Sequence, residues 1–181
     1  MSRLSIPTLD DAPEASKPIL EAVKGQLGSV PNMFRLIASS PAALTAYTGA
    51  NAALSKTLDL KTRERIALAV AQVNGCGYCL SAHSYLATNL AKIAPEEVEL
   101  ARNGGSQDPQ AHAAVNFARK VAEERGHVSE ADIAEVRAAG FSEAQVVEIV
   151  ALVAENTFTN YLNEVAKTDI DFPVVQTQLA A

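Results

Sequence analysis

One stretch, residues 64–83, holds both cysteines of the chain and restricts its fold more than any other part of the sequence. Residues 64–73 distribute Ile, Leu, Val and Ala around most of a helix and contain no proline, which predicts a buried helix. Asn74 and Gly75 interrupt this pattern. A second helix is predicted to begin at or near Cys76. Because their spacing follows the helical repeat, Cys76, Cys79 and His83 should share one face of it.

A turn at Gly75 would fold these two helices into an antiparallel hairpin with Glu64 and His83 at one level. At a rise of roughly 1.5 Å per residue, Glu64 lies about 16 Å before the turn and His83 about 12 Å after it. Helical side chains lean towards the N-terminus, so His83 is expected to reach back over Cys79 and deprotonate that thiol. The positive end of the helix dipole also favours its thiolate. Cys76 is then the partner, and two cysteines one turn apart can form a disulfide after local adjustment.

Glu64, Cys76, Cys79 and His83 form the pattern Glu-x11-Cys-x2-Cys-x3-His, which closely resembles the signature of the AhpD-like alkylhydroperoxidases in the carboxymuconolactone decarboxylase superfamily. Residues 30–34, Val-Pro-Asn-Met-Phe, followed by Ser-Pro at 40–41, are similar to the start of the peroxidase-related branch of that group. The resemblance covers most of the chain. It implies a single-domain AhpD-like helical bundle with the Cys-x2-Cys at the start of a central helix.

The resemblance also implies an activity and a role for each residue. It implies an antioxidant dithiol peroxidase for alkyl or hydrogen peroxides, in which Cys79 is peroxidatic, Cys76 is resolving, and His83 with Glu64 forms a proton relay. An external lipoyl or thioredoxin-like dithiol would reduce the resulting disulfide, and no haem, flavin, metal or other cofactor is implied. Family members with demonstrated peroxidase activity can carry a second histidine just before the second cysteine. This chain has Tyr78 there, which implies a shorter relay and a weaker activity, and Tyr78 fits either a packing role or a hydroxyl donor near the thiols.

Composition argues against several classes of function. The formal net charge is −6 and Lys and Arg do not cluster, so the basic face that nucleic acid requires is missing. The first residues lack the apolar core of a signal peptide, and no apolar run approaches the ~18 residues of a membrane span. We therefore expect a cytoplasmic protein that contacts no membrane. In a reducing compartment, a Cys-x2-Cys is more often redox-active or metal-binding than a structural disulfide.

The rest of the sequence predicts an all-α fold in one domain, residues 1–181, with an extended leader at about 1–12 and a fraying tail at about 174–181. Alanine is abundant and aromatic residues make up only 5%, so the helices should pack closely through small side chains. Helices so apolar must bury more than one face, which predicts a homo-oligomer, and the family resemblance makes it a trimer or a hexamer. Turn and capping residues predict further helices at 13–25, 31–38, 42–54, 95–103, 109–126 and 129–139, with Asp59 capping the Glu64 helix and Ser142 with Gln145 opening the longest one.

Three alternatives use the same residues. Cys76, Cys79, His83 and Glu64 are also a possible set of four zinc ligands in a metal-binding module without catalysis. The cysteines could instead be small core residues, with Glu64 in a solvated ion pair with its basic neighbours. The third is the lactone decarboxylation known in the superfamily, which is not expected to need a cysteine pair. The last helix also carries asparagines that fit either buried hydrogen-bond donors or polar-face residues: Asn156, Asn160 and Asn163.

Overall fold

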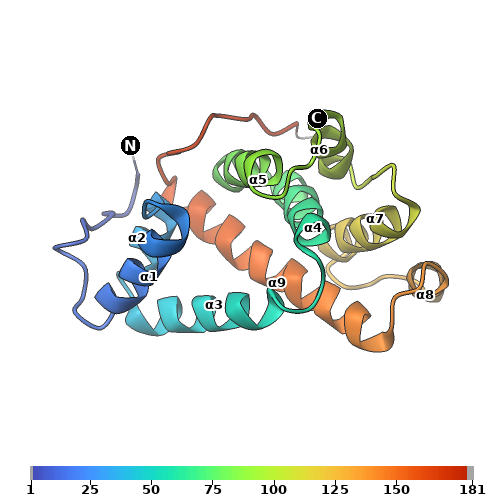
Figure 1. Cartoon of the computed structure of the whole chain (residues 1–181), viewed down its shortest axis with the longest axis horizontal. Coiled ribbons are helices and arrows are strands. Elements are labelled where there is room, and N and C mark those ends of the chain that lie inside the picture. The colour runs from blue at the N-terminus through green and yellow to red at the C-terminus, as the bar shows by residue number, and fades with distance from the viewer. Residues whose placement is uncertain (1, 179–181) are drawn as a thin grey trace.

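The computed structural model describes residues 2–178, and every regular element in that range is a helix, which confirms the predicted all-α fold. The nine helices of this range are shown in Figure 1 and have the following bounds: α1 Lys17–Leu27, α2 Asn32–Ile37, α3 Pro41–Leu54, α4 Leu60–Val73, α5 Gly77–Asn89, α6 Pro95–Arg102, α7 Pro109–Glu123, α8 Glu130–Ala138 and α9 Glu143–Ala166.

α4 lies at the centre of the fold, where it packs against α5, α6, α7 and α9. Its sequence explains this position, because Ile66, Leu68 and Val70 are fully buried together with the alanines between them. Small side chains on α4 and α7 let the helix axes approach closely. The long helix α9 runs diagonally across the molecule (Figure 1), and its apolar inward face joins α4 and α7 in one core cluster.

The predicted helix ends are largely confirmed. The Asp59 carboxylate accepts a hydrogen bond from the backbone N–H of Thr62 at 3.1 Å, and Ser142 and Gln145 form a reciprocal capping box at the start of α9. α1, however, begins four residues later than predicted, at Lys17 rather than at residue 13. Pro18 explains the difference, because a proline tolerated in the first turn would break the interior of a longer helix.

The α4–α5 hairpin turns at Gly75, whose φ of 66° lies in the left-handed region that glycine adopts without strain. The chain reverses there, and the backbone N–H of Cys76 donates to the carbonyl of Ala71 at 3.0 Å. This bond satisfies one of the last carbonyls of α4. The predicted break at residues 74–75 is therefore confirmed, and α5 returns along α4.

After α9 the chain crosses α5 and reaches α6 as an extended segment (Figure 1), here called the C-terminal strap, residues 169–178. The N–H of Val175 donates to the Ser81 hydroxyl at 2.9 Å, and Arg102 donates to the carbonyl of Gln176 at 2.9 Å. Residues 174–178 of the expected fraying tail are thus tied to the helices. Its last residues, 179–181, and residue 1 of the expected leader lie outside the described residues.

The outward face of α9 carries a row of exposed apolar side chains along its whole length. We call this row the α9 stripe; its members are Val147, Val150, Phe158, Tyr161 and Val165. Within residues 2–178, no helix combines the length and the apolarity that crossing a bilayer requires.

Candidate functional site

The hairpin brings Glu64 of α4 against His83 of α5. Nδ1 of His83 lies 2.9 Å from Oε2 of Glu64, and the two side chains are 24% and 11% exposed. The prediction that these residues lie at one level is confirmed. Burial by itself would lower the pKa of His83, but the Glu64 carboxylate outweighs burial and the pKa is raised. The imidazole therefore holds a proton more tightly than a free histidine does.

The two cysteines occupy the first turn of α5 as free thiols. Cys76 is the N-cap residue, and its sulfur accepts a hydrogen bond from the backbone N–H of Cys79 at 3.2 Å. Both are buried, at 0% and 2% exposure. A serine or aspartate commonly holds this position, so here a thiol supplies the acceptor that a helix start requires.

The surroundings of the two thiols separate their acidities. A hydrogen bond from Cys76 lowers the pKa of Cys79 most strongly, burial opposes this, and the positive charge of His83 lowers the pKa further. The pKa of Cys76 is raised, first by its hydrogen bond to Cys79 and then by burial. Cys79 is thus the more acidic thiol, in the direction that the sequence predicted. Within residues 2–178 no hydrogen bond joins His83 to Cys79, so His83 acts on this sulfur through its charge rather than through the direct contact expected.

Two asparagines of α9 approach the same sulfur. Nδ2 of Asn163 donates to Sγ of Cys79 at 3.3 Å and also to the carbonyl of Thr159 at 2.9 Å. Asn74, in the hairpin turn, donates to Oδ1 of Asn160 at 2.9 Å. Both Asn160 and Asn163 lower the pKa of Cys79. The sequence left these asparagines open, and the structure places them inward, facing the thiols.

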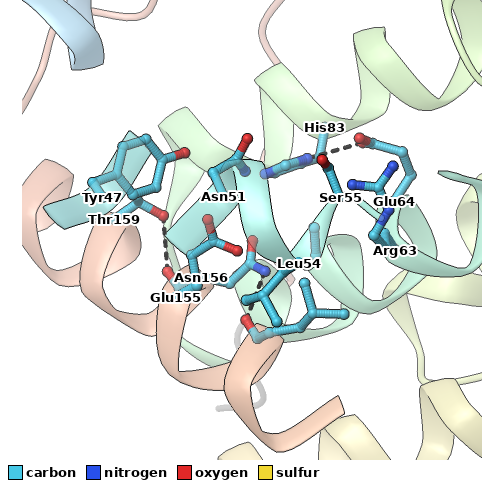
Figure 2. Close-up of a pocket in the computed structure, with 12 residues that line it drawn as sticks. Tyr47, Asn51, Leu54, Ser55, Arg63, Glu64, His83, Glu155, Asn156 and Thr159 are labelled. Carbon is cyan, nitrogen blue, oxygen red and sulfur yellow. Dashed lines mark hydrogen bonds and ion pairs between the residues drawn. The ribbon is translucent and has the colours of Figure 1, made fainter. Parts of the chain in front are cut away.

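A small polar cavity lies beside His83, between α3, α4, α5 and α9 (Figure 2). Its volume is about 60 Å³, and its polar lining residues are Tyr47, Asn51, Ser55, Arg63, Glu64, His83, Glu155, Asn156 and Thr159. A water molecule has a share of roughly 30 Å³ in the liquid, so about two water molecules fit. The cavity therefore suits a small polar molecule or a short chain of waters next to the imidazole.

Glu155 was missed by sequence reasoning. It reaches this cavity from α9, across from Glu64 (Figure 2), and its Oε1 is buried with no hydrogen-bond partner within residues 2–178. Burial raises the pKa of Glu155, while a hydrogen bond from Asn51 and the charges of His83 and Arg63 oppose the shift. A polar residue in an apolar helix was the only sequence signal. It could not show which neighbours Glu155 would face.

The side chain of Tyr78 is held by contacts with α2 and with the C-terminal strap. Its hydroxyl donates to Oδ1 of Asp171 at 2.7 Å and accepts from the backbone N–H of Met33 at 3.1 Å. Its ring packs edge-on against Phe172, with the centroids 5.9 Å apart. Tyr78 thereby ties α5 to α2 and to the C-terminal strap, and its hydroxyl points to these partners rather than to the thiols.

Among the described residues, no group of three or more His, Cys, Asp or Glu side chains is arranged to hold a metal ion.

Comparison with known proteins agrees with this fold. The sequence profile of the carboxymuconolactone decarboxylase family matches residues 39–124. No curated protein matches the chain. Among solved structures, the AhpD-core, peroxidase-related protein from Ralstonia eutropha JMP134 has a TM-score of 0.84 and 26% identity over 94% of this chain and 92% of that chain. A peroxidase-related protein from Silicibacter sp. TM1040 has a TM-score of 0.81 and 25% identity over 93% of this chain and 91% of that chain.

A third structure extends the range of chemistry found with this fold. The debrominase Bmp8 superposes with a TM-score of 0.76 and 23% identity over 94% of this chain and 91% of that chain, a likeness of fold. Residues 39–124 thus match the carboxymuconolactone decarboxylase family, and the fold of the chain is that of the two peroxidase-related, AhpD-like structures.

Proposed function

We propose that this protein is a dithiol peroxidase that reduces alkyl or hydrogen peroxides. The observation that carries the proposal is the unequal pair of buried thiols at the start of α5. Cys79 is the more acidic of the two and Cys76 lies one turn away as its partner. A thiolate, not a thiol, attacks peroxides, so a pair of which one member ionises readily is suited to this reaction.

In the proposed reaction the Cys79 thiolate attacks the terminal oxygen of the hydroperoxide, a sulfur–oxygen bond forms and the oxygen–oxygen bond breaks. Sulfur is oxidised to a sulfenic acid, and the leaving alkoxide or hydroxide takes a proton from His83. The Cys76 thiol then attacks the Cys79 sulfur, water leaves, and a disulfide forms. An external dithiol returns both cysteines to thiols and is itself oxidised to a disulfide.

In the proposed cycle, His83 accepts and donates the proton that is transferred, and Glu64 holds His83 in place. The carboxylate at 2.9 Å keeps the imidazole in place and favours its charged form, which in turn favours the Cys79 thiolate. When Cys79 loses its proton, His83 can take it and later give it to the leaving oxygen. The cavity has room for about two water molecules, or for one hydroperoxide group.

Debromination is the second candidate, because a cysteine-to-alanine variant of Bmp8 in complex with 2,3,4-tribromopyrrole has this fold, with a TM-score of 0.79 and 22% identity. The cavity of about 60 Å³ beside His83 is small for a brominated ring, which favours a peroxide.

The zinc and decarboxylase alternatives can be distinguished from a peroxidase by what each requires. A zinc module needs bound metal, whereas a decarboxylase keeps its turnover without the thiols.

The test is peroxide consumption with a panel of lipoyl, thioredoxin-like and small dithiol donors. We expect turnover in the wild-type protein, none in Cys79→Ser, and a single equivalent consumed by Cys76→Ser. Three parallel measurements separate the alternatives: bromide release from a bromopyrrole, metal content of protein purified without chelator, and lactone decarboxylation by the variant that lacks both thiols. Absence of peroxide consumption with every donor, even in a single turnover, contradicts the proposal.

A further inference from the structure

The carboxyl group of Glu155 lines the same small cavity as His83, and the proposed reaction gives it no role (Figure 2). Within residues 2–178, the amide of Asn51 is its one hydrogen-bond donor. The two oxygens of a carboxylate can together accept about four hydrogen bonds. Most of the hydrogen-bonding capacity of Glu155 is therefore left for the contents of the cavity.

The imidazole of His83 has one nitrogen left for the same cavity. Its Nδ1 lies 2.9 Å from Glu64, and within residues 2–178 its Nε2 has no hydrogen-bond partner. Figure 2 shows the ring extending from Glu64 towards Asn51, the side of the cavity on which Glu155 lies. The volume of about 60 Å³ holds about two water molecules, enough to connect Nε2 with the carboxyl group of Glu155.

The surroundings of Glu155 suit a group that stores a proton. Burial has the largest effect and raises the pKa of Glu155, while Asn51 and the positive charges of His83 and Arg63 oppose the shift. Glu155 thus keeps its proton to a higher pH than a free glutamate does, which brings it closer to the working range of a proton donor. The charged and titratable groups that face it from the other helices are Tyr47 of α3, Arg63 and Glu64 of α4, and His83 of α5.

We infer that Glu155 is a second positioning residue for His83: through water in the cavity it returns a proton to Nε2 after the imidazole has given its own to the leaving oxygen. This inference rests on the proposed peroxidase function and adds the group that recharges His83. Glu155 acts through His83 rather than on the peroxide. Asn51 and Ser55, which also line the cavity, are exposed, so Glu155 can regain its proton from solvent.

The protons of the proposed cycle balance with this step. The carboxylic acid gives a proton to a water and the water gives one to Nε2, so a carboxylate and an imidazolium result. Once the disulfide has formed, the external dithiol loses one proton to solvent, attacks the Cys76 sulfur and releases Cys79 as a thiolate. Its second thiol then displaces Cys76, which keeps that proton. A more acidic thiol leaves a disulfide faster, and the charge of His83 lowers the pKa of Cys79, so a recharged His83 favours reduction.

The first test measures proton transfer directly and needs neither peroxide nor dithiol. NMR of the reduced protein gives the rate at which the ring N–H of His83 exchanges with water. Glu155→Gln keeps the shape of the side chain but has no acidic proton. Exchange should therefore slow about 10-fold, less than the roughly 10²- to 10⁴-fold of a group that acts on the reacting atom itself.

A matched control and a rescue separate this role from a structural one. Glu148→Gln removes another acid of α9, one that does not line the cavity, and should exchange at the wild-type rate. Glu155→Ala should exchange as slowly as Glu155→Gln. Sodium formate, which supplies a small carboxylic acid, should restore the rate in Glu155→Ala, whereas sodium chloride at the same concentration should not.

The second test places the proton transfer in the proposed cycle. Reduction of the Cys76–Cys79 disulfide by dithiothreitol should slow about 10-fold in Glu155→Gln, by the same reasoning. Sulfenic acid formation in the first turnover should slow by less, because Glu64 still favours a charged His83 at the start.

Wild-type exchange in Glu155→Gln overturns the inference and leaves the peroxidase proposal standing, as does equal slowing in Glu148→Gln. Slowing that formate does not reverse in Glu155→Ala also overturns it, as does slower exchange with unchanged disulfide reduction. If the wild-type protein consumes no peroxide in a single turnover, the proposed function fails and the inference fails with it. Slower exchange and slower reduction that are confined to the Glu155 variants, with rescue by formate, support it.

Discussion

The substitution Glu64→Gln tests the link between the carboxylate and the imidazole while keeping the shape of the side chain. Glu64 bonds His83 at 2.9 Å and is 11% exposed, so solvent screens the pair only partly. A hydrogen bond to a charged group contributes about 1.5–3 kcal/mol, which corresponds to about 10- to 100-fold in an equilibrium or a rate. We expect the single-turnover reaction with peroxide at pH 7 to slow by this factor. The deficit should shrink towards pH 10, where Cys79 ionises without help.

Two further measurements follow from the raised pKa of His83. NMR titration of the His83 ring should show a lower pKa in Glu64→Gln. Because the folded protein binds this proton more tightly than the unfolded chain, the stabilisation is complete below the unfolded value of 6.5 and is lost as the pH rises through the folded value. The variant should therefore lose more stability at pH 6 than at pH 9.

The matched control is Glu97→Gln, which breaks the ion pair of Glu97 with Arg65 at 3.1 Å, another partly buried pair of α4. It should lower stability without changing the His83 titration or the pH dependence of the reaction. An unchanged His83 titration in Glu64→Gln, or equal slowing at pH 7 and pH 10, refutes the reasoning.

Three other predictions concern the thiols, the cavity and assembly. With a sulfenic acid trap and mass spectrometry, Cys76→Ser should carry the trap on Cys79, whereas Cys79→Ser should carry none; a trap on Cys76 alone reverses the roles. Glu155→Gln should leave the free energy of unfolding unchanged near pH 4 and raise it at pH 8, because the folded state disfavours the charged carboxylate; a lower free energy of unfolding at pH 8 contradicts this. The predicted homo-oligomer should bury the α9 stripe, so Tyr161→Asp should lower the molar mass seen by light scattering, and a wild-type monomer at micromolar concentration contradicts the prediction.

The elements that the sequence predicted well are those whose cause is local. The turn at Gly75, the Asp59 cap and the capping box of Ser142 each depend on residues within one helical turn. The contact of Glu64 with His83 also follows from local geometry, since a tight turn between two helices sets their level from the rise per residue alone. One hairpin therefore fixes half of the candidate site.

The other half depends on how α9 crosses that hairpin. The spacing of Asn156, Asn160 and Asn163 puts them on one helical face, but helical spacing cannot show that this face meets a thiol rather than solvent. Glu155 illustrates the same limit, because its neighbours come from three other helices that are distant in sequence. The reach of His83 back over Cys79 has the same dependence on a second helix, since one ring nitrogen bonds the Glu64 carboxylate of α4.

Burial of the cysteines places different demands on the two halves of the proposed cycle. A hydroperoxide group is small enough for the cavity of about 60 Å³ beside His83, so little room has to open between that cavity and the thiol. A dithiol on a lipoyl arm or a protein must bring its own sulfur into contact with the disulfide, and Cys76 and Cys79 are 0% and 2% exposed. The reductive half of the cycle therefore requires a larger opening than the oxidative half. The C-terminal strap packs Ile170 and Phe172 against the cluster that contains both cysteines, and hydrogen bonds to Tyr78, Ser81 and Arg102 hold it there, so an opening on this side must break them.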